Sequence, residues 1–128
     1  MILFLDTTTD SITIALCSHK GRILRQNTFA RTEDGGNQTF RTIVKLLGKD
    51  RPDGVIVVIG SGRFSGIRHG VTIANALAFA WGIRAVGVTK KLDEDTATII
   101  MRGVSLLART RSSRFVLPLY DREPSVTV

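Results

Sequence analysis

The segment Gly60–Gly70, GSGRFSGIRHG, has the composition of a phosphate-binding loop. It lies between two apolar runs, so its backbone N–H groups could converge at a helix N-terminus and bind an anion. A nucleotide P-loop ends in Gly-Lys-Ser/Thr, which this segment lacks. The dinucleotide spacing Gly-x-Gly-x-x-Gly is also absent, because one and three residues separate Gly60, Gly62 and Gly66. Nucleotide binding by this loop alone is therefore the weaker interpretation.

Asp6 ends the first apolar run of the chain and is followed by three threonines. Such a position suits a metal-binding carboxylate or hydroxyls that contact a phosphate. The candidate phosphate contacts are Asp6, Thr7, Thr8, Ser61 and Gly62. Two-metal nuclease chemistry needs further carboxylates, and only the acidic run 93–95 could supply them. A role as a turn or strand-end cap is the simpler interpretation of Asp6.

The remaining reactive side chains do not form a recognisable site. His19 and His69 have no carboxylate or cysteine at ligand spacing, so we predict no metal site. Two isolated histidines do not support a Ser–His–Asp triad either. Cys17, the single cysteine, is most simply a small core residue. We predict no catalytic residue.

Composition predicts one globular domain over residues 1–128, with 43% apolar residues. No apolar run is long enough to span a bilayer, and the first residues lack the basic start of a signal peptide, so we expect a cytoplasmic protein without membrane contact. The net charge of +7 would attract RNA, but the basic residues are scattered. Solubility is the preferred explanation of the charge, and direct RNA contact is the alternative.

Three strands joined by short turns are predicted first, and helices then alternate with strands. The predicted strands are 2–7, 11–17, 22–29, 55–60 and 84–89, and the predicted helices begin at Asn37, Ser65 and Asp93. Gly82 should close the second helix, and residues 114–120 should form a last extended piece. The order βββαβαβα predicts a mixed five-stranded sheet with helices on its faces. This is the ribonuclease-H-like fold, which also forms one lobe of actin-like proteins.

Small residues recur every four positions along the second predicted helix, at Gly66, Gly70, Ala74 and Ala78. They form one stripe that another element can approach closely. Because the helix is apolar nearly all round, we expect one side to meet the sheet and another to meet a partner. Packing of that second side against the first helix is the alternative.

The central segment resembles the TsaB (YeaZ) family, whose members carry Gly-x-Gly-Ser-Phe-Thr-Gly-Leu-Arg-x-Gly before a small-residue helix. Residues 64–68 and Gly70 fall on that pattern. The start, ILFLDTTTDSITIAL, and the end, LPLYDREPSVT, resemble the opening and closing motifs of the family. The resemblance implies that residues 1–90 form the first lobe and residues 91–128 a return helix and tail. Family members have a second lobe where this chain has only residues 90–114.

The resemblance implies a non-catalytic subunit of the machinery that makes threonylcarbamoyladenosine in tRNA. Such subunits bind the TsaD-type catalytic transferase subunit, or form homodimers, through the first two helices, and they contact tRNA indirectly. No cofactor is expected, except ATP or ADP at an interface with the catalytic partner. The candidate partner interface is Phe40, Val44, Leu47, Phe64, Gly66, Ile67, Gly70, Val71, Ala74 and Ala78. The alternative function is a metal-dependent nuclease of the Holliday-resolvase type, built on Asp6 and an acid from 93–95.

Overall fold

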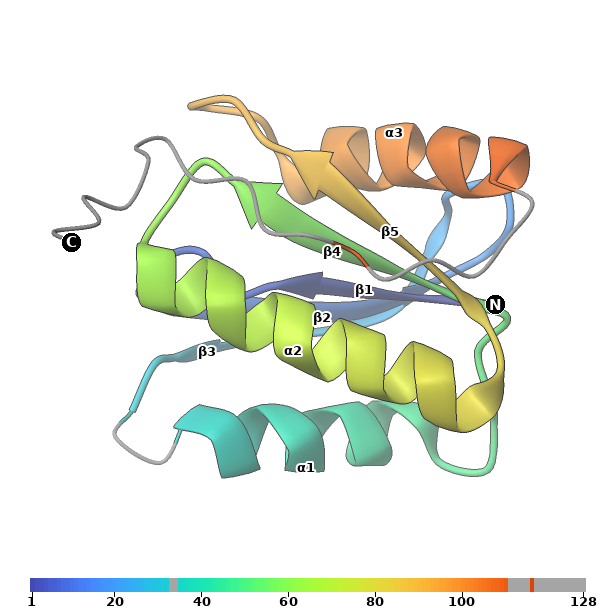
Figure 1. The fold of residues 1–128 in the computed structure, drawn as a ribbon, viewed down its shortest axis with the longest axis horizontal. Coiled ribbons are helices and arrows are strands. Elements are labelled where there is room, and N and C mark those ends of the chain that lie inside the picture. Colours follow the sequence, from blue (N-terminus) through green and yellow to red (C-terminus); the bar gives the residue numbers. More distant parts are fainter. Residues whose placement is uncertain (33–34, 111–115, 117–128) are drawn as a thin grey trace, which may run out of the picture.

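A computed structural model of the chain describes residues 1–32, 35–110 and 116. Its elements follow the order βββαβαβα (Figure 1). The strands are β1 (Ile2–Asp6), β2 (Ser11–Cys17), β3 (Ile23–Ala30), β4 (Gly54–Gly60) and β5 (Arg84–Thr89). The helices are α1 (Gly35–Leu47), α2 (Phe64–Trp81) and α3 (Thr96–Arg109). None of the helices within these ranges is long and apolar enough to cross a membrane.

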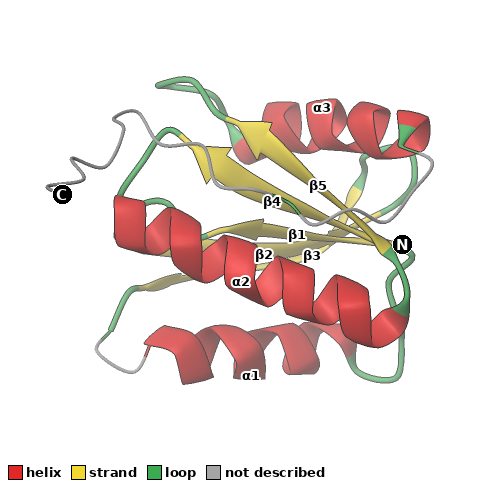
Figure 2. Cartoon of the chain, viewed as in Figure 1, coloured by secondary structure: helices red, strands yellow, loops and turns green. Residues whose placement is uncertain are grey.

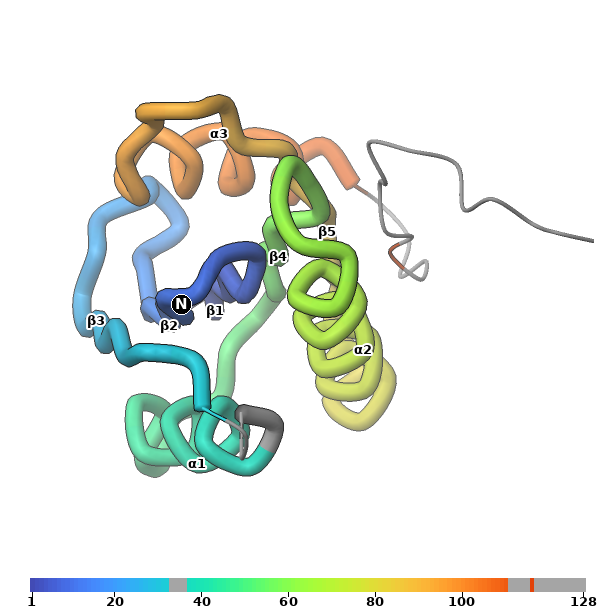
Figure 3. Tube along the Cα trace, turned by 90° about the vertical axis from the view of Figure 1, so that its left-hand side faces the viewer, coloured from blue at the N-terminus to red at the C-terminus, as the bar shows by residue number. Residues whose placement is uncertain are grey.

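The five strands form one mixed sheet in the order β3-β2-β1-β4-β5. The first three strands are an antiparallel meander, and β1, β4 and β5 run parallel to one another. Helix α2 forms the crossover connection between the parallel neighbours β4 and β5, and α1 connects β3 to β4. Helices α1 and α2 cover one face of the sheet and α3 covers the other (Figures 2 and 3). The predicted fold, a ribonuclease-H-like or actin-like lobe, is confirmed.

The core has two parts, one on each face of the central strands. Leu3 and Leu5 of β1 join the cluster under α1 and α2, whereas Ile2 and Phe4 join the cluster under α3. Successive side chains of a strand point to opposite faces, so a strand covered on both faces must be apolar throughout. This requirement explains the uninterrupted apolar sequences of β1 and β4.

Two predicted helix starts are wrong. Helix α1 begins at Gly35, so Asn37 lies inside its first turn and is not its N-cap. Helix α3 begins at Thr96, not at Asp93, because Asp93 has a left-handed backbone (φ 70°) that a helix cannot contain. Asp95 is the N-cap of α3, and its carboxylate accepts a hydrogen bond from the Thr98 N–H at 2.8 Å. The predicted closure of α2 by Gly82 is confirmed.

The predicted extended piece 114–120 lies outside the described residues except for Val116. Val116 is buried, and its N–H and C=O both bond the side-chain amide of Asn75 on α2, at 2.8 and 2.9 Å. Its side chain lies over Gly87 of β5. The closing motif of the resemblance, 117–127, also lies outside the described residues.

The Cys17 thiol is predicted to be unreactive in the folded protein. Cys17 is fully buried at the end of β2, and burial raises the pKa of its thiol to about 11. The thiolate fraction at pH 8 is then roughly a hundredfold smaller than at an ordinary thiol, and the reagent must also reach a buried atom. Labelling with a chromogenic disulfide should therefore be complete in denaturant and at least about a hundredfold slower in buffer. Fast labelling in buffer would contradict the placement of Cys17 in the core.

Candidate functional site

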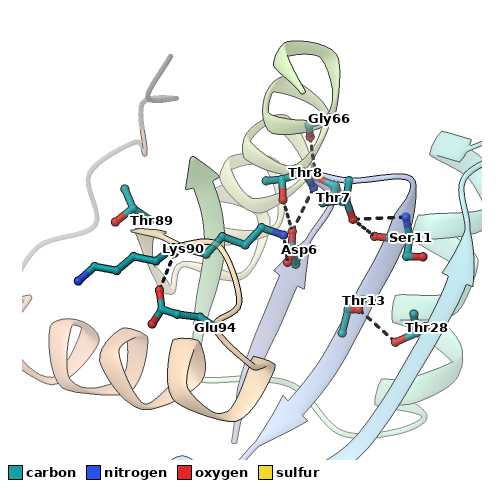
Figure 4. Close-up of polar contacts among 12 residues, drawn as sticks. Asp6, Thr7, Thr8, Ser11, Thr13, Thr28, Gly66, Thr89, Lys90 and Glu94 are labelled. Atoms are coloured by element: carbon teal, nitrogen blue, oxygen red, sulfur yellow. Dashed lines mark hydrogen bonds and ion pairs between the residues drawn. The ribbon is translucent and has the colours of Figure 1, made fainter. Parts of the chain in front are cut away.

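Asp6 lies at the carboxyl end of β1, and Thr8 and Lys90 contact its carboxylate (Figure 4). One oxygen, Oδ1, accepts hydrogen bonds from the Thr8 N–H at 3.1 Å and from the Thr8 hydroxyl at 2.6 Å. The other, Oδ2, forms an ion pair with Lys90 Nζ at 2.9 Å. The short-range bonds to Thr8 match the predicted strand-end role of Asp6. The ion pair with Lys90 was not predicted.

Lys90 follows β5, and Asp6 ends β1. Because β1, β4 and β5 run parallel, their carboxyl ends lie on the same side of the sheet, and Lys90 can reach Asp6. The Lys90 N–H donates to the Gly60 carbonyl at 2.6 Å, which fixes the backbone at the end of β5. The side chains of Lys90 and Asp6 are 19% and 12% exposed, so the pair is largely shielded from water. The Lys90 ammonium group thus lies beside the Asp6 carboxylate and balances its charge. No motif marked Lys90 in the sequence.

Thr7 joins the end of β1 to the first turn of α2. Its hydroxyl donates to the Gly66 carbonyl at 2.6 Å, and both residues are buried. A Cβ on Gly66 would lie 2.2 Å from the Thr7 carbonyl oxygen, so only glycine fits there. Arg31 also donates to the Thr7 carbonyl from the loop after β3. Glycine in this loop therefore allows the close approach of α2 to the strand.

The glycine-rich loop packs against Thr8 next to this contact. A Cβ on Gly62 would lie 2.5 Å from the Thr8 Cβ, and the Arg63 N–H donates to the Thr8 carbonyl at 2.9 Å. Ser61 and Gly62 are exposed, whereas Thr7 and Thr8 are buried and use their hydroxyls internally. The structure thus brings the five candidate phosphate contacts together. Their contact with a phosphate stays a prediction.

Two residues of the acidic run 93–95 have structural partners away from Asp6. Glu94 forms an ion pair with Arg102 and accepts a hydrogen bond from the Lys91 N–H at 2.6 Å. These contacts lower the pKa of its carboxyl, and Asp95 caps α3. Within the part of the chain that the structure describes, no group of three His, Cys, Asp or Glu residues could hold a metal ion. The convergence of acids that a two-metal nuclease needs is not found there.

His69 connects the two helices that share a face of the sheet. Its Nε2 lies 3.3 Å from the Thr39 hydroxyl of α1. Burial lowers the pKa of the imidazole, and the positive charge of Arg31 lowers it further. His69 also lines a shallow cavity of about 320 Å³ on the outer side of α2, together with Phe64, Ser65, Arg68 and Thr72. The cavity is open to solvent next to the contact between His69 and Thr39.

The residues of the predicted partner interface fall into two groups. Phe40, Val44 and Phe64 are 53%, 52% and 49% exposed. The others are buried inside the fold: Leu47, Gly66, Ile67, Gly70, Val71, Ala74 and Ala78. The stripe of small residues was expected to admit a partner, but a Cβ on Gly70 would meet Thr7 and Val57 of the same chain. The stripe therefore packs on the protein's own sheet, and this part of the expectation is corrected.

Searches for similar proteins returned matches among solved structures. No protein-family model and no curated protein matches the chain. YeaZ from Pseudomonas aeruginosa matches with a TM-score of 0.61 and 25% identity, over 69% of this chain and 43% of that chain. A second structure, of an uncharacterized protein with similarity to the peptidase YEAZ from P. aeruginosa, matches with the same TM-score and identity over 69% and 42%. This chain spans less than half of either matched structure.

A third structure, Thermus thermophilus RuvC in complex with a Holliday junction substrate, has a TM-score of 0.58. It covers 81% of this chain and 90% of that chain at 9% identity. At this identity the similarity concerns the fold alone. The structure and the comparisons together establish that the chain has the ribonuclease-H-like fold, in the arrangement that YeaZ and RuvC share.

Proposed function

We propose that this protein is a non-catalytic partner subunit of the machinery that makes threonylcarbamoyladenosine in tRNA. It binds the catalytic transferase subunit, or a second copy of itself, through the outer surfaces of α1 and α2. The 25% identity to YeaZ over 69% of the chain supports this proposal. The proposal also rests on the YeaZ-like motif in residues 64–70.

The observation that carries the proposal is the exposed apolar side chains on the two adjacent helices. Phe40 and Val44 are one turn apart on α1, so they lie on one face of that helix, and Phe64 begins α2. About half of each side chain is in contact with water. Large apolar side chains that are exposed on neighbouring helices mark a candidate site of protein association. Aromatic residues in such a patch are common anchors of interfaces.

The contacts of Asp6 favour a subunit without its own chemistry. Both carboxylate oxygens already have partners, Thr8 and Lys90. A nuclease of the Holliday-resolvase type would need this carboxylate to bind a metal ion, and the Lys90 ammonium stands in its way. The similarity to RuvC concerns the fold and does not extend to a metal centre among the described residues.

Replacing Phe40 and Val44 by glutamate is expected to abolish association. The charges would be desolvated in an interface, so affinity for the transferase subunit, or for a second copy, should fall at least about a hundredfold. The measurement is the mass in solution by light scattering, alone and mixed with the transferase subunit of the same organism. Both side chains are about half exposed, so the variant should keep its unfolding midpoint.

Leu24→Glu supplies the matched control, because Leu24 is 47% exposed and belongs to strand β3, not to either helix. This variant should associate like the natural protein. Equal loss of association in both variants would show a general effect of added charge. If the natural protein is a monomer and does not bind the transferase subunit, the proposed function itself is contradicted.

A further inference from the structure

The outer edge of β5 is a surface to which the proposed function gives no role. Strand β5 is the last in the sheet order and pairs with β4 on one side. Among the described residues, no strand pairs with its other side. An edge strand presents backbone N–H and C=O groups that can pair with another strand. The sequence of β5, RAVGVT, contains no proline that would block such pairing.

A groove of about 550 Å³ runs between this edge and α3. Its floor is partly apolar, with Val88 of β5 and Leu106 of α3. Gly87, Thr89, Met101, Arg102, Ser105 and Arg109 complete the lining. The groove therefore combines the last strand of the sheet, a partly apolar floor and two arginines.

The two arginines of the groove indicate the charge of the ligand that it could bind. The Arg102 guanidinium already binds a carboxylate, that of Glu94, and donates to the Thr89 carbonyl at the end of β5. The Arg109 guanidinium donates a long hydrogen bond, 3.4 Å, to the Ser105 carbonyl of its own helix. A guanidinium in this position can bind a carboxylate with two parallel hydrogen bonds. Glu94 neutralises Arg102, whereas no carboxylate among the described residues forms an ion pair with Arg109. The Arg109 guanidinium is therefore the group of the groove that is complementary to an acidic ligand.

We propose that the β5 edge and this groove form a binding site for an extended acidic segment of a partner protein. The segment would add to the sheet as a strand beside β5. Arg102 and Arg109 are two helical turns apart, which is about 10 Å along α3. Side chains on alternate residues of an extended strand point to the same face, about 7 Å apart, so one carboxylate of the segment can reach Arg109 while Arg102 keeps its bond to Glu94. The site lies on the α3 side of the sheet, so it is independent of the α1–α2 surface.

The test uses three short synthetic peptides and the full chain. In the first peptide glutamate alternates with valine, in the second lysine replaces glutamate, and in the third proline replaces valine. The first peptide should bind at least about tenfold tighter than either of the others, because only it has both the carboxylates and the free backbone N–H groups. Binding is measured by fluorescence anisotropy of a labelled peptide at 0.15 M salt, about the physiological ionic strength.

Two charge-reversed variants locate the binding site. Arg109→Glu should weaken binding of the acidic peptide about tenfold, because it removes one carboxylate contact and adds repulsion. Arg51→Glu changes the net charge equally but lies in the exposed loop after α1, so it should leave binding unchanged. Equal binding of the proline peptide would overturn strand addition, and equal weakening by both variants would overturn the location. Absence of binding by the acidic peptide would overturn the whole proposal.

Discussion

Gly66→Ala is expected to destabilise the protein by about 3 kcal/mol or more, the upper range for overpacking a core. The added Cβ would lie 2.2 Å from the Thr7 carbonyl oxygen and 2.7 Å from the Arg31 guanidinium. The carbonyl oxygen belongs to the backbone at the end of β1, which its neighbours in the sheet hold in place. Helix α2 would have to move away from the strand and break the bond from the Thr7 hydroxyl to the Gly66 carbonyl.

The measurement is urea unfolding of both proteins followed by circular dichroism. Gly82→Ala is the matched control on the same helix, because a Cβ on Gly82 meets nothing within 4 Å. Gly82 has a left-handed backbone (φ 63°), so alanine there should cost only the conformational strain, about 1 kcal/mol. A Gly66→Ala protein as stable as the Gly82→Ala protein would show that α2 does not lie so close to β1.

Because the stripe of small residues packs on the sheet, bulky substitutions along it test the stability of the fold and not the partner interface. Gly70 and Ala74 belong to the predicted partner interface, so a bulky residue at either position would be a natural test of association. Both positions face the protein's own sheet, so these substitutions should unfold the protein first. Loss of binding in such variants would therefore not locate an interface. The exposed side chains of Phe40 and Val44 are the better test.

Lys90→Met is expected to lower the free energy of unfolding by about 2 kcal/mol at pH 7. The substitution keeps the aliphatic stem but leaves the Asp6 carboxylate without its cation in a largely buried place. Removing one partner of a fully buried pair costs about 3–5 kcal/mol, and residual exposure of both side chains reduces this figure. Lys91→Met is the control, since Lys91 is an exposed neighbour with the same charge. It should change stability by less than about 0.5 kcal/mol.

A double variant separates the ion pair from other effects of Lys90. Adding Asp6→Asn to Lys90→Met removes the uncompensated charge, so the double variant should be more stable than Lys90→Met alone. The asparagine can still accept the hydrogen bonds from Thr8 through its carbonyl oxygen. Additive losses from the two substitutions would contradict a direct interaction between Asp6 and Lys90.

Local pattern was sufficient for most of the fold. Three short patterns each predicted one feature correctly. They are the alternation in β2, the continuous apolar run of β4 and the glycine that closes α2. The start of α3 was predicted wrongly because the pattern of residue types does not show the backbone conformation of each residue. Asp93 reads as an acidic residue in a first helical turn, but its left-handed backbone delays the start of α3 to Thr96.

The candidate site was predicted less completely than the fold. Asp6, Thr7, Thr8 and the loop at Ser61–Gly62 were identified from their place after two strands. Lys90 was missed, since it lies 84 positions after Asp6 and no spacing rule links them. The stripe of small residues on α2 was identified correctly as a place of close packing. The periodicity of the sequence does not tell which element packs against this stripe.

The sequence by itself determined the order of the elements and the composition of each, because hydrogen bonding and apolar periodicity act over short stretches of chain. Only the tertiary structure decided that Lys90 neutralises Asp6, that the small-residue stripe faces the sheet, and that β5 is the last strand in the sheet order. These three facts depend on which strands become neighbours. That choice is made by burying apolar surface across the whole domain, and it brings together residues that are distant in the chain.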